Sequence, residues 1–450
     1  MADNNLLTVE IERMGQAGDG VGRMPDGRLI FIPGGLPGEL VRVRVIETRK
    51  NFARGALVSA KRTVPTRVAP VCPIFGQCGG CAFQHWDYGA ELAYKENRVR
   101  EALTRIAQVN GDLVEAIRGC PDPYGYRNKG QFPFGGTRGK VRLGLYRRGT
   151  HEVIGAAHCA IQDPWVNELL QVAEDLVNRF RIPPYDETQR SGILRHLLIR
   201  SSRMEQKLLA LLVVTEPHPE LASLAEAIMA AVPRVAGVGM NVQPAPTNRV
   251  LGERTVCLAG QDSLIDSILG LRFRMSYTSF FQVNPGQVEV LYRAALNFLP
   301  GGPSEVWDLY SGVGTLAALA AREARWVRAL EVNPEAVHDA RENFALNHLT
   351  NVGVEVGRVE DVIDAWVKRA ADPPGTVIVD PPRAGLDGRV VERLNVLKPG
   401  RIIYISCNPD TWARDVGRLS PHFQLMQAIP VDMFPRTDHV EVASWLARSS

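Results

Sequence analysis

The sequence predicts an α/β protein made of a small β-barrel, a central α+β part and a C-terminal part with a largely parallel sheet. Apolar and polar residues alternate with period two through residues 6–62, between Gly and Pro turns, as in small barrels. From about residue 270, strand patterns alternate with helix patterns, which indicates a sheet with crossover helices. We expect domain boundaries that give residues 1–63, 64–268 and 269–450.

The individual elements follow in chain order. The barrel strands are expected at LLTVEIERMG, GRLIFIPG, ELVRVRVIETRK and FARGALVSAKR, and TVPTRVAPVCP is expected to be a linker. A helix pattern covers YGAELAYKENRVREALTRIA, and strand patterns follow at YRNKGQFPF, KVRLGLYRR and ILRHLLIRSS. No internal repeat or low-complexity segment interrupts this order.

The composition is that of a globular protein, with 450 residues, 45% of them hydrophobic and 22% charged. The first residues lack the basic and apolar stretches of a secretory signal, and the apolar run at 208–214 is too short to span a bilayer. We therefore expect a cytoplasmic monomer without membrane contact. The net charge is only +3, but residues 41–70 hold eight Lys and Arg residues and one Glu. Such runs are usually solvated surface, yet here they alternate with β-forming residues, which suits a barrel face that contacts phosphates.

The segment EVWDLYSGVGTLAALAARE predicts a strand, a glycine turn and a helix. Gly312 and Gly314 allow a tight turn and the close approach of a ligand. The next strand ends at Glu331, about twenty residues later, where a carboxylate can accept both hydroxyls of an adenosine ribose. The glycine pattern alone would also fit NAD, or a turn that binds no nucleotide.

Two further strands end in polar residues, at Asp380 of VIVDPPR and at Cys407 of YISCNPD. Because ligands bind beyond the carboxyl ends of the strands in such sheets, we expect both residues to share one crevice with Glu331. A lone cysteine is more often part of a core. However, Asn408-Pro409 predicts a helix N-terminus beside the thiol, which would lower its pKa and favour a reactive thiolate. A thiolate has no obvious function in hydride transfer, but it can activate an electron-poor ring by covalent addition.

A cluster of cysteines, Cys72, Cys78 and Cys81, lies in the glycine-containing segment CPIFGQCGGC. Three thiols this close in a cytosolic chain indicate a metal centre, and both zinc and iron–sulfur clusters take four thiolates. The spacing does not decide between these metals. The candidates for the fourth ligand are Cys120, Cys159 and Cys257.

Taken in order, FFQVNP, DLYSGVGTLA, EVNPEAV, VDPPRAGL, ISCNPDTWARD and DHVEVASWL resemble the motifs of the S-adenosylmethionine-dependent RNA uracil-5-methyltransferases. CPIFGQCGGC resembles the iron–sulfur segment of the branch that acts on 23S ribosomal RNA. The first 62 residues resemble its TRAM domain, an OB-like RNA-binding barrel. The resemblance covers nearly the whole chain. It implies a Rossmann-like methyltransferase domain at the C-terminus and a [4Fe–4S] cluster with Cys159 as the fourth ligand.

The resemblance also implies roles for single residues. Cys407 would be the nucleophile and Glu441 the general base. The residues implied at the S-adenosylmethionine site are Gln282, Tyr310, Glu331 and Asp380, beside the turn glycines Gly312 and Gly314. Two positions depart from the family pattern. Thr315 stands where many relatives have Asn, and Arg358 where they often have Asp, so Glu360 or Asp361 is the candidate for the contact near adenine.

The implied chemistry explains this residue set. The Cys407 thiolate adds to C6 of uracil, C5 of the resulting enolate attacks the methyl group, and Glu441 removes the C5 proton so that the thiolate can leave. A stacked base cannot react, so we expect a flipped or loop uridine, with Phe280 or Phe281 available for stacking. The polar residues expected to face RNA in the central part are Arg127, Asn128, Lys129, Arg195, His196 and Arg200.

We expect the product to be 5-methyluridine in 23S ribosomal RNA, and the alternative is methylation of the tRNA T-loop. Two other classes are weighed. An NAD-dependent oxidoreductase with a zinc site would leave the DPPR and SCNP motifs without a function. A non-catalytic RNA-binding protein would not need both Cys407 and Glu441.

Overall fold

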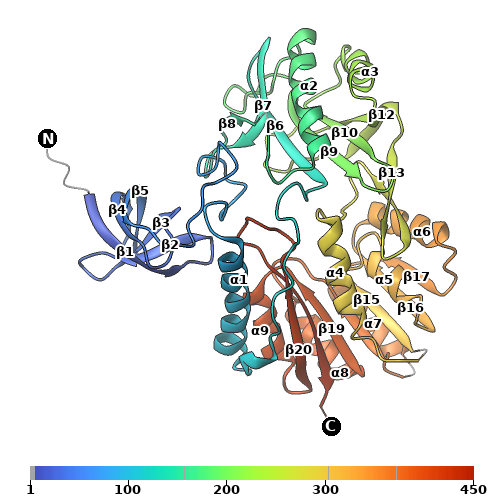
Figure 1. Ribbon diagram of the computed structural model, residues 1–450. Helices are drawn as coiled ribbons and strands as arrows, with labels where there is room; N and C mark the ends of the chain where they lie inside the picture. The colour runs from blue at the N-terminus through green and yellow to red at the C-terminus, as the bar shows by residue number, and fades with distance from the viewer. Residues whose placement is uncertain (1–5, 157, 303, 371, 450) are drawn as a thin grey trace.

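The protein is described by a computed structural model, which covers residues 6–156, 158–302, 304–370 and 372–449. Figure 1 shows three groups of elements: a barrel to one side, a central sheet with two helices, and a C-terminal sheet flanked by helices. In the part of the chain that is described, no helix is long and apolar enough to cross a membrane.

The N-terminal group is a closed five-stranded barrel with the strand order β1-β2-β3-β5-β4. Its strands are β1 (Leu6–Met14), β2 (Asp19–Arg23), β3 (Leu29–Pro33), β4 (Leu40–Thr48) and β5 (Phe52–Arg62). The alternation in the sequence separates its two faces, because Val41 and Val43 are buried in the barrel core while Arg42 and Arg44 are exposed. The predicted barrel is confirmed.

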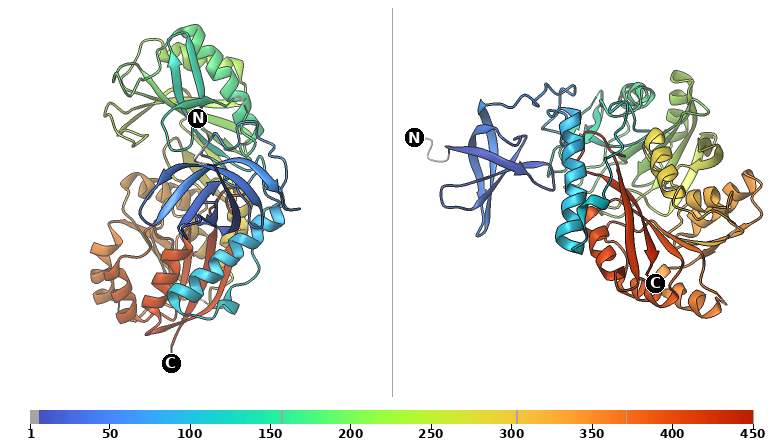
Figure 2. Two further views of the ribbon diagram at one scale, coloured as in Figure 1. Left: turned by 90° about the vertical axis from the view of Figure 1, so that its left-hand side faces the viewer. Right: turned by 60° about the horizontal axis from the view of Figure 1, so that its bottom comes forward.

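The first long helix, α1 (Tyr88–Ala102), continues into a π-helical turn (Leu103–Ala107). Asp87 caps its start by accepting a hydrogen bond from the backbone N of Ala90 at 3.2 Å. Although α1 lies within residues 64–268, its buried residues share a core with the C-terminal helix α9 (Pro409–Leu419). Figures 1 and 2 both show α1 beside the C-terminal strands. The chain therefore joins the C-terminal part before it forms the central sheet.

The central sheet has seven strands in the order β12-β11-β10-β9-β6-β7-β8. These strands are β6 (Lys129–Thr137), β7 (Lys140–Tyr146), β8 (Val153–Gly155), β9 (Leu194–Ser202), β10 (Lys207–Val214), β11 (Val235–Val242) and β12 (Arg254–Gly260). Helices α2 (Pro164–Phe180) and α3 (Leu221–Ala231) contribute to the same core as Leu208, Ala210 and Leu212 of β10. The alternate residues Leu209, Leu211 and Val213 belong instead to a core shared with the C-terminal part. The strand β10 is thus buried on both faces.

A hairpin, β13 (Ser263–Ile268) and β14 (Leu271–Ser276), leads into the C-terminal sheet, whose order is β17-β16-β15-β18-β19-β21-β20. Its strands are β15 (Glu305–Leu309), β16 (Trp326–Glu331), β17 (Val352–Val356), β18 (Thr376–Val379), β19 (Arg401–Ser406), β20 (Phe423–Val431) and β21 (Glu441–Arg448). All neighbours pair in parallel except β19–β21 and β20–β21. The helices are α4 (Pro285–Leu296), α5 (Thr315–Ala320), α6 (Pro334–Leu346), α7 (Val359–Arg369), α8 (Gly388–Leu397) and α9.

The order of the strands reverses at β15, because the chain moves outward to β16 and β17 and then returns to β18 on the other side. The crevice at such a switch point is where α/β sheets bind ligands. The predicted α/β fold class is confirmed, and this topology brings the carboxyl ends of β15, β16, β18 and β19 to one edge.

Candidate active site

A cavity of about 770 Å³ opens at this switch point. The sequence-predicted residues that line it are Gln282, Tyr310, Gly312, Glu331, Asp380, Cys407 and Glu441. Gly314 does not line it. Gly314 has a φ of +76°, and a Cβ there would lie 2.7 Å from the ring of Phe344. Gly314 therefore serves the turn and the close packing of α5 against α6.

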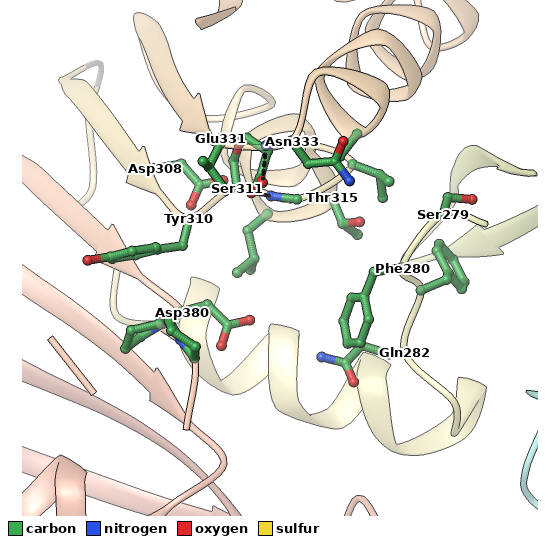
Figure 3. A pocket seen from close by; sticks show the side chains of 18 of the residues that line it. Ser279, Phe280, Gln282, Asp308, Tyr310, Ser311, Thr315, Glu331, Asn333 and Asp380 are labelled. Atoms are coloured by element: carbon green, nitrogen blue, oxygen red, sulfur yellow. Dashed lines mark hydrogen bonds between the residues drawn. The ribbon is translucent and has the colours of Figure 1, made fainter. Parts of the chain in front are cut away.

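The glycine turn and Glu331 are held together by hydrogen bonds, which Figure 3 shows at one wall of the cavity. The carboxylate of Glu331 accepts a hydrogen bond from the backbone N of Gly312 at 3.0 Å and from that of Asn333 at 2.8 Å. Tyr310 begins this turn with a φ of +69°. The half-buried carboxylate is thus fixed at the end of β16, where the ribose of a nucleotide would bind.

Asp308, the next-to-last residue of β15, also lines the cavity, although it was not among the residues predicted from the sequence. Its side chain is fully buried, and among the described residues the backbone N–H of Ala317 approaches its carboxyl group without reaching ordinary hydrogen-bond geometry. Burial, together with the nearby Asp380, raises its pKa well above the usual value. A single acidic residue inside the apolar strand EVWDL was the signal that could have identified it.

The thiol of Cys407 lies among charged neighbours. Burial raises the pKa of Asp380 to about 7, and burial followed by the charge of Asp380 raises that of Glu441 to about 8. Burial and then these two carboxylates raise the pKa of Cys407 to about 11, although the guanidinium of Arg383 opposes them. The predicted cap is confirmed, since the Asn408 side chain accepts from the backbone N of Asp410 and Pro409 follows. The predicted lowering of the thiol pKa is wrong, because burial and two carboxylates outweigh one helix terminus.

The cation beside the thiol, Arg383, is anchored at both ends. Its Nη2 donates a hydrogen bond to Nε2 of His439 at 3.1 Å, so this ring nitrogen is unprotonated. Its carbonyl oxygen accepts hydrogen bonds from the side chains of Asn408 (3.2 Å) and Thr411 (3.1 Å) at the start of α9. Arg383 is therefore held next to Cys407 by the same helix terminus.

The two adjacent phenylalanines have different environments. Phe280 is 66% exposed and lines the cavity, whereas Phe281 is 4% exposed and belongs to the core. Figure 3 shows Phe280 and Gln282 on the cavity side. Of the two predicted stacking residues, only Phe280 is available to a base.

The residues that depart from the family pattern also lie at this site. Thr315 lines the cavity and is buried. The side chain of Arg358 is exposed and lies 3.7 Å from Glu360 and 3.9 Å from Asp361. Glu360 lines the cavity and accepts a hydrogen bond from the hydroxyl of Tyr310 at 3.3 Å, whereas Asp361 does not line it.

A second cavity, of about 380 Å³, is lined by all four predicted metal ligands, Cys72, Cys78, Cys81 and Cys159. The sulfur of Cys78 accepts a hydrogen bond from the backbone N of Gly80, and that of Cys81 accepts one from Nε2 of Gln84, each at 3.3 Å. Cys120 and Cys257 line neither cavity. In the described ranges, no group of three or more His, Cys, Asp or Glu side chains could hold a single metal ion.

Of the six residues predicted to face RNA in the central part, Asn128, Arg195, His196 and Arg200 are buried, and Arg127 and Lys129 line the cysteine cavity. Arg195 and Arg200 are buried, at 5% and 4% exposure, and donate to backbone carbonyls, so their predicted RNA contact is wrong. Arg200 instead holds the carbonyls of residues 277 and 279, directly before Phe280. Burial of β9 on both faces is the physical reason.

The doubly wound sheet, the glycine turn and the acidic residue at the end of β16 define a nucleotide-binding site of the kind that S-adenosylmethionine-dependent methyltransferases use. Residues 265–449 match the family described as tRNA (Uracil-5-)-methyltransferase, and residues 5–58 match the TRAM domain. Uncharacterized RNA methyltransferases are similar over nearly the whole chain. The Bacillus cereus protein is 37% identical (98% of this chain, 97% of that protein), and the Listeria innocua protein is 35% identical (98% of each).

A solved structure is also similar. The crystal structure of the Pyrococcus abyssi tRNA (uracil-54, C5)-methyltransferase in complex with S-adenosyl-L-homocysteine is 26% identical, with a TM-score of 0.79 over 98% of this chain and all of that one. The chain belongs to the RNA uracil-5-methyltransferase family and is a S-adenosylmethionine-dependent RNA methyltransferase. The predicted family and enzyme class are confirmed, and the oxidoreductase alternative is set aside.

Proposed function

We propose that this protein methylates C5 of a uridine in 23S ribosomal RNA through a covalent bond between Cys407 and C6 of the base. One observation carries the proposal. Cys407 and Glu441, which follow and begin the paired strands β19 and β21, line the same cavity as the glycine turn and Glu331. A nucleophile, a proton acceptor and a nucleotide site in one cavity are what methyl transfer to a pyrimidine carbon needs.

The donor site is proposed from the cavity walls. S-adenosylmethionine supplies an electrophilic methyl group on a positively charged sulfur. Glu331 would accept the ribose hydroxyls, and Glu360 with Tyr310 would flank the adenine. The buried side chains of Asp308 and Asp380 support a cationic ligand beside them, because a cation would offset the burial that raises their pKa values.

The base chemistry is then assigned to three residues of the chain. The sulfur of Cys407 forms a bond to C6, and C5 accepts the methyl group. The Glu441 carboxylate takes the C5 proton, the C5–C6 double bond reforms and the sulfur leaves. A pKa of about 8 suits a proton acceptor working near neutral pH, and Phe280 is proposed to stack on the flipped base.

The four-cysteine cavity is proposed to hold a [4Fe–4S] cluster. The N–H donors aimed at Cys78 and Cys81 suit thiolate sulfur. The choice of an iron–sulfur cluster over zinc rests on the resemblance of CPIFGQCGGC to the iron–sulfur segment of the family. Iron and acid-labile sulfide analysis of protein purified without oxygen tests this assignment, and about four of each per chain is expected.

The substrate is proposed to be 23S ribosomal RNA because the CPIFGQCGGC segment resembles that branch of the family. The similarity to a tRNA (uracil-54, C5)-methyltransferase favours the alternative of a T-loop substrate. The division at residues 63/64 and 268/269, the monomeric state and a cytoplasmic location belong to the same proposal.

The deciding experiment is a methyl-transfer assay with labelled S-adenosylmethionine and unmodified transcripts of 23S ribosomal RNA and of tRNA. Modified nucleosides are then mapped by mass spectrometry. We expect 5-methyluridine in the ribosomal RNA alone. Label confined to the tRNA T-loop would move the protein to the alternative substrate, and label at another atom of uracil would overturn the proposed chemistry.

A further inference from the structure

The loop over residues 432–440, between β20 and β21, brings the proposed base to the cavity. It carries Phe434 and His439, which line the cavity, and it ends where Glu441 begins β21. Cys407, Gly312 and the rest of the donor site lie on other elements. The loop therefore connects Val431 of β20 to Glu441 of β21, two residues that pair with each other, and it flanks the side of the cavity where Glu441 lies, whereas Cys407 lies on another element.

Arg436 lies in the middle of this loop in the left-handed backbone region, with a φ of +68°. Such a conformation persists in a non-glycine residue only when its surroundings fix it. Its backbone N donates to Oε1 of Glu91 at 2.8 Å, and its carbonyl oxygen accepts from the backbone N of Ala82 (2.8 Å) and of Phe83 (3.0 Å). The backbone of Arg436 is thus bonded on both sides to residues more than 300 positions earlier.

The side chain of Arg436 is only 7% exposed and makes a second set of contacts. Its Nη1 donates to the carbonyl of Trp86 at 2.9 Å and lies 3.4 Å from the Glu91 carboxylate. The guanidinium carbon lies 5.0 Å from the ring centre of Tyr88 and 4.9 Å from that of Tyr124. A planar cation between two rings is a contact that lysine cannot reproduce.

The start of the loop is held by a buried ion group. The amine of Lys95 donates to Glu91 at 2.7 Å, to Asp432 at 2.8 Å and to the carbonyl of Phe434 at 3.2 Å. The hydroxyl of Tyr88 donates to Asp432 at 2.8 Å. All three charged residues are fully buried, so removing one would leave the others uncompensated.

We propose that Arg436 is a positioning residue that clamps the 432–440 loop onto the segment following Cys81, so that Glu441 reaches the C5 proton. This inference rests on the proposed function, in which Glu441 is the base. The segment that follows Cys81 then contributes to catalysis by holding this loop in place. Loss of the clamp slows proton removal and thiol release more than it slows methyl transfer, because Cys407 and the donor site lie on other elements and Arg383, although it donates to His439 of the loop, is still held through its carbonyl by Asn408 and Thr411.

The test compares Arg436→Gln with Arg436→Lys, and uses Glu441→Gln as the benchmark for a stalled enzyme. Arg195→Gln is the matched control, because Arg195 is also a buried arginine that stacks on a tyrosine (4.7 Å from Tyr185) and donates to carbonyls, but in the central sheet. Folding of every variant is checked by calorimetric binding of S-adenosylhomocysteine. Hydrogen exchange over residues 432–441 reports the loop, and protein–RNA adduct on denaturing gels reports the stalled step.

We expect Arg436→Gln to raise amide exchange in the loop at least tenfold and to accumulate adduct, as Glu441→Gln does, with single-turnover methyl transfer reduced less than threefold. Arg436→Lys, which keeps the charge, is expected to be intermediate, and it decides the question if the Gln variant does not fold. Arg195→Gln should change neither readout.

Unchanged exchange in both Arg436 variants would overturn the clamp. Faster exchange without adduct, while Glu441→Gln stalls, would overturn the positioning of the base and leave the proposed function standing. A Glu441→Gln enzyme that releases product freely would overturn the base assignment itself, and with it the role given to Arg436.

Discussion

The catalytic cavity and the four-cysteine cavity both contain cysteine thiols, and they differ in the charge around the sulfur. In the cysteine cavity, N–H donors face the sulfurs of Cys78 and Cys81. In the catalytic cavity, Cys407 lies near the carboxylates of Asp380 and Glu441, which raise its pKa further after burial has raised it. Burial raises the pKa of both thiols, to about 12 at Cys81 and to about 11 at Cys407, but the N–H of Gln84 opposes the rise at Cys81 whereas the two carboxylates add to it at Cys407. The groups around the sulfur, rather than its burial, therefore distinguish the two cavities.

The largest expected effect comes from removing one thiol from each cavity in turn and comparing what each variant loses. Cys407→Ala should lower the rate of methyl transfer by at least about 10³-fold, because no other group can form the bond to C6. It should keep its iron and its affinity for S-adenosylhomocysteine. Cys81→Ser should lose most of the iron but keep the alkylation of Cys407 by iodoacetamide.

The control for both variants is Cys257→Ser, which alters an exposed thiol that lines neither cavity. It should behave as the unmodified protein in turnover, iron content and ligand binding. Normal turnover by Cys407→Ala would contradict the covalent role, and full iron retention by Cys81→Ser would contradict the metal role.

The second prediction concerns stability and pH, through the carboxylates that distinguish the catalytic cavity. Burial raises the pKa of Glu441 to about 8 in the folded protein, from 4.5 in an unfolded chain. The folded state therefore binds more protons between these values, and the stabilisation present below pH 4.5 is lost as the pH rises towards 8. Glu441→Gln should be more stable than the unmodified protein at pH 8.5, by about 1 to 4 kcal/mol, and nearly equal at pH 5.

Thermal unfolding at both pH values measures this difference. Glu335→Gln, at the first turn of α6, is a control in the same domain whose carboxylate is exposed. If the two variants shift the transition equally at each pH, the buried ionisation of Glu441 is not its cause.

Much of the catalytic cavity could be predicted because its residues follow strands in a recognisable order. Once the sheet is parallel, Glu331, Asp380 and Cys407 must meet at one edge, whatever the details of packing. Asp308 was missed because an acidic residue within an apolar strand carries no sign of which cavity it will face. Gly314 was placed at the ligand, but the sequence does not show that Phe344 packs against it.

Contacts between distant segments could not be predicted. The polar residues of β9 suggested an RNA-facing surface for Arg195 and Arg200, whereas the strand is buried on both faces. The helix pattern of α1 was visible, but its packing on α9 was not. The ion group of Lys95 joins residues more than 300 positions apart, and no local pattern reports such a pair.

The smallest expected effect concerns Phe280, which lines both cavities. Because its ring is 66% exposed, Phe280→Ala should change the unfolding free energy by less than about 0.5 kcal/mol. Loss of base stacking should cost about 1 to 3 kcal/mol of transition-state binding, seen as a rise in KM for RNA with unchanged S-adenosylhomocysteine affinity. Val396→Ala, another exposed apolar residue but on α8, is the control. A loss of iron in Phe280→Ala would instead assign the ring to the cysteine cavity, and equal KM values in all three proteins would remove it from RNA binding.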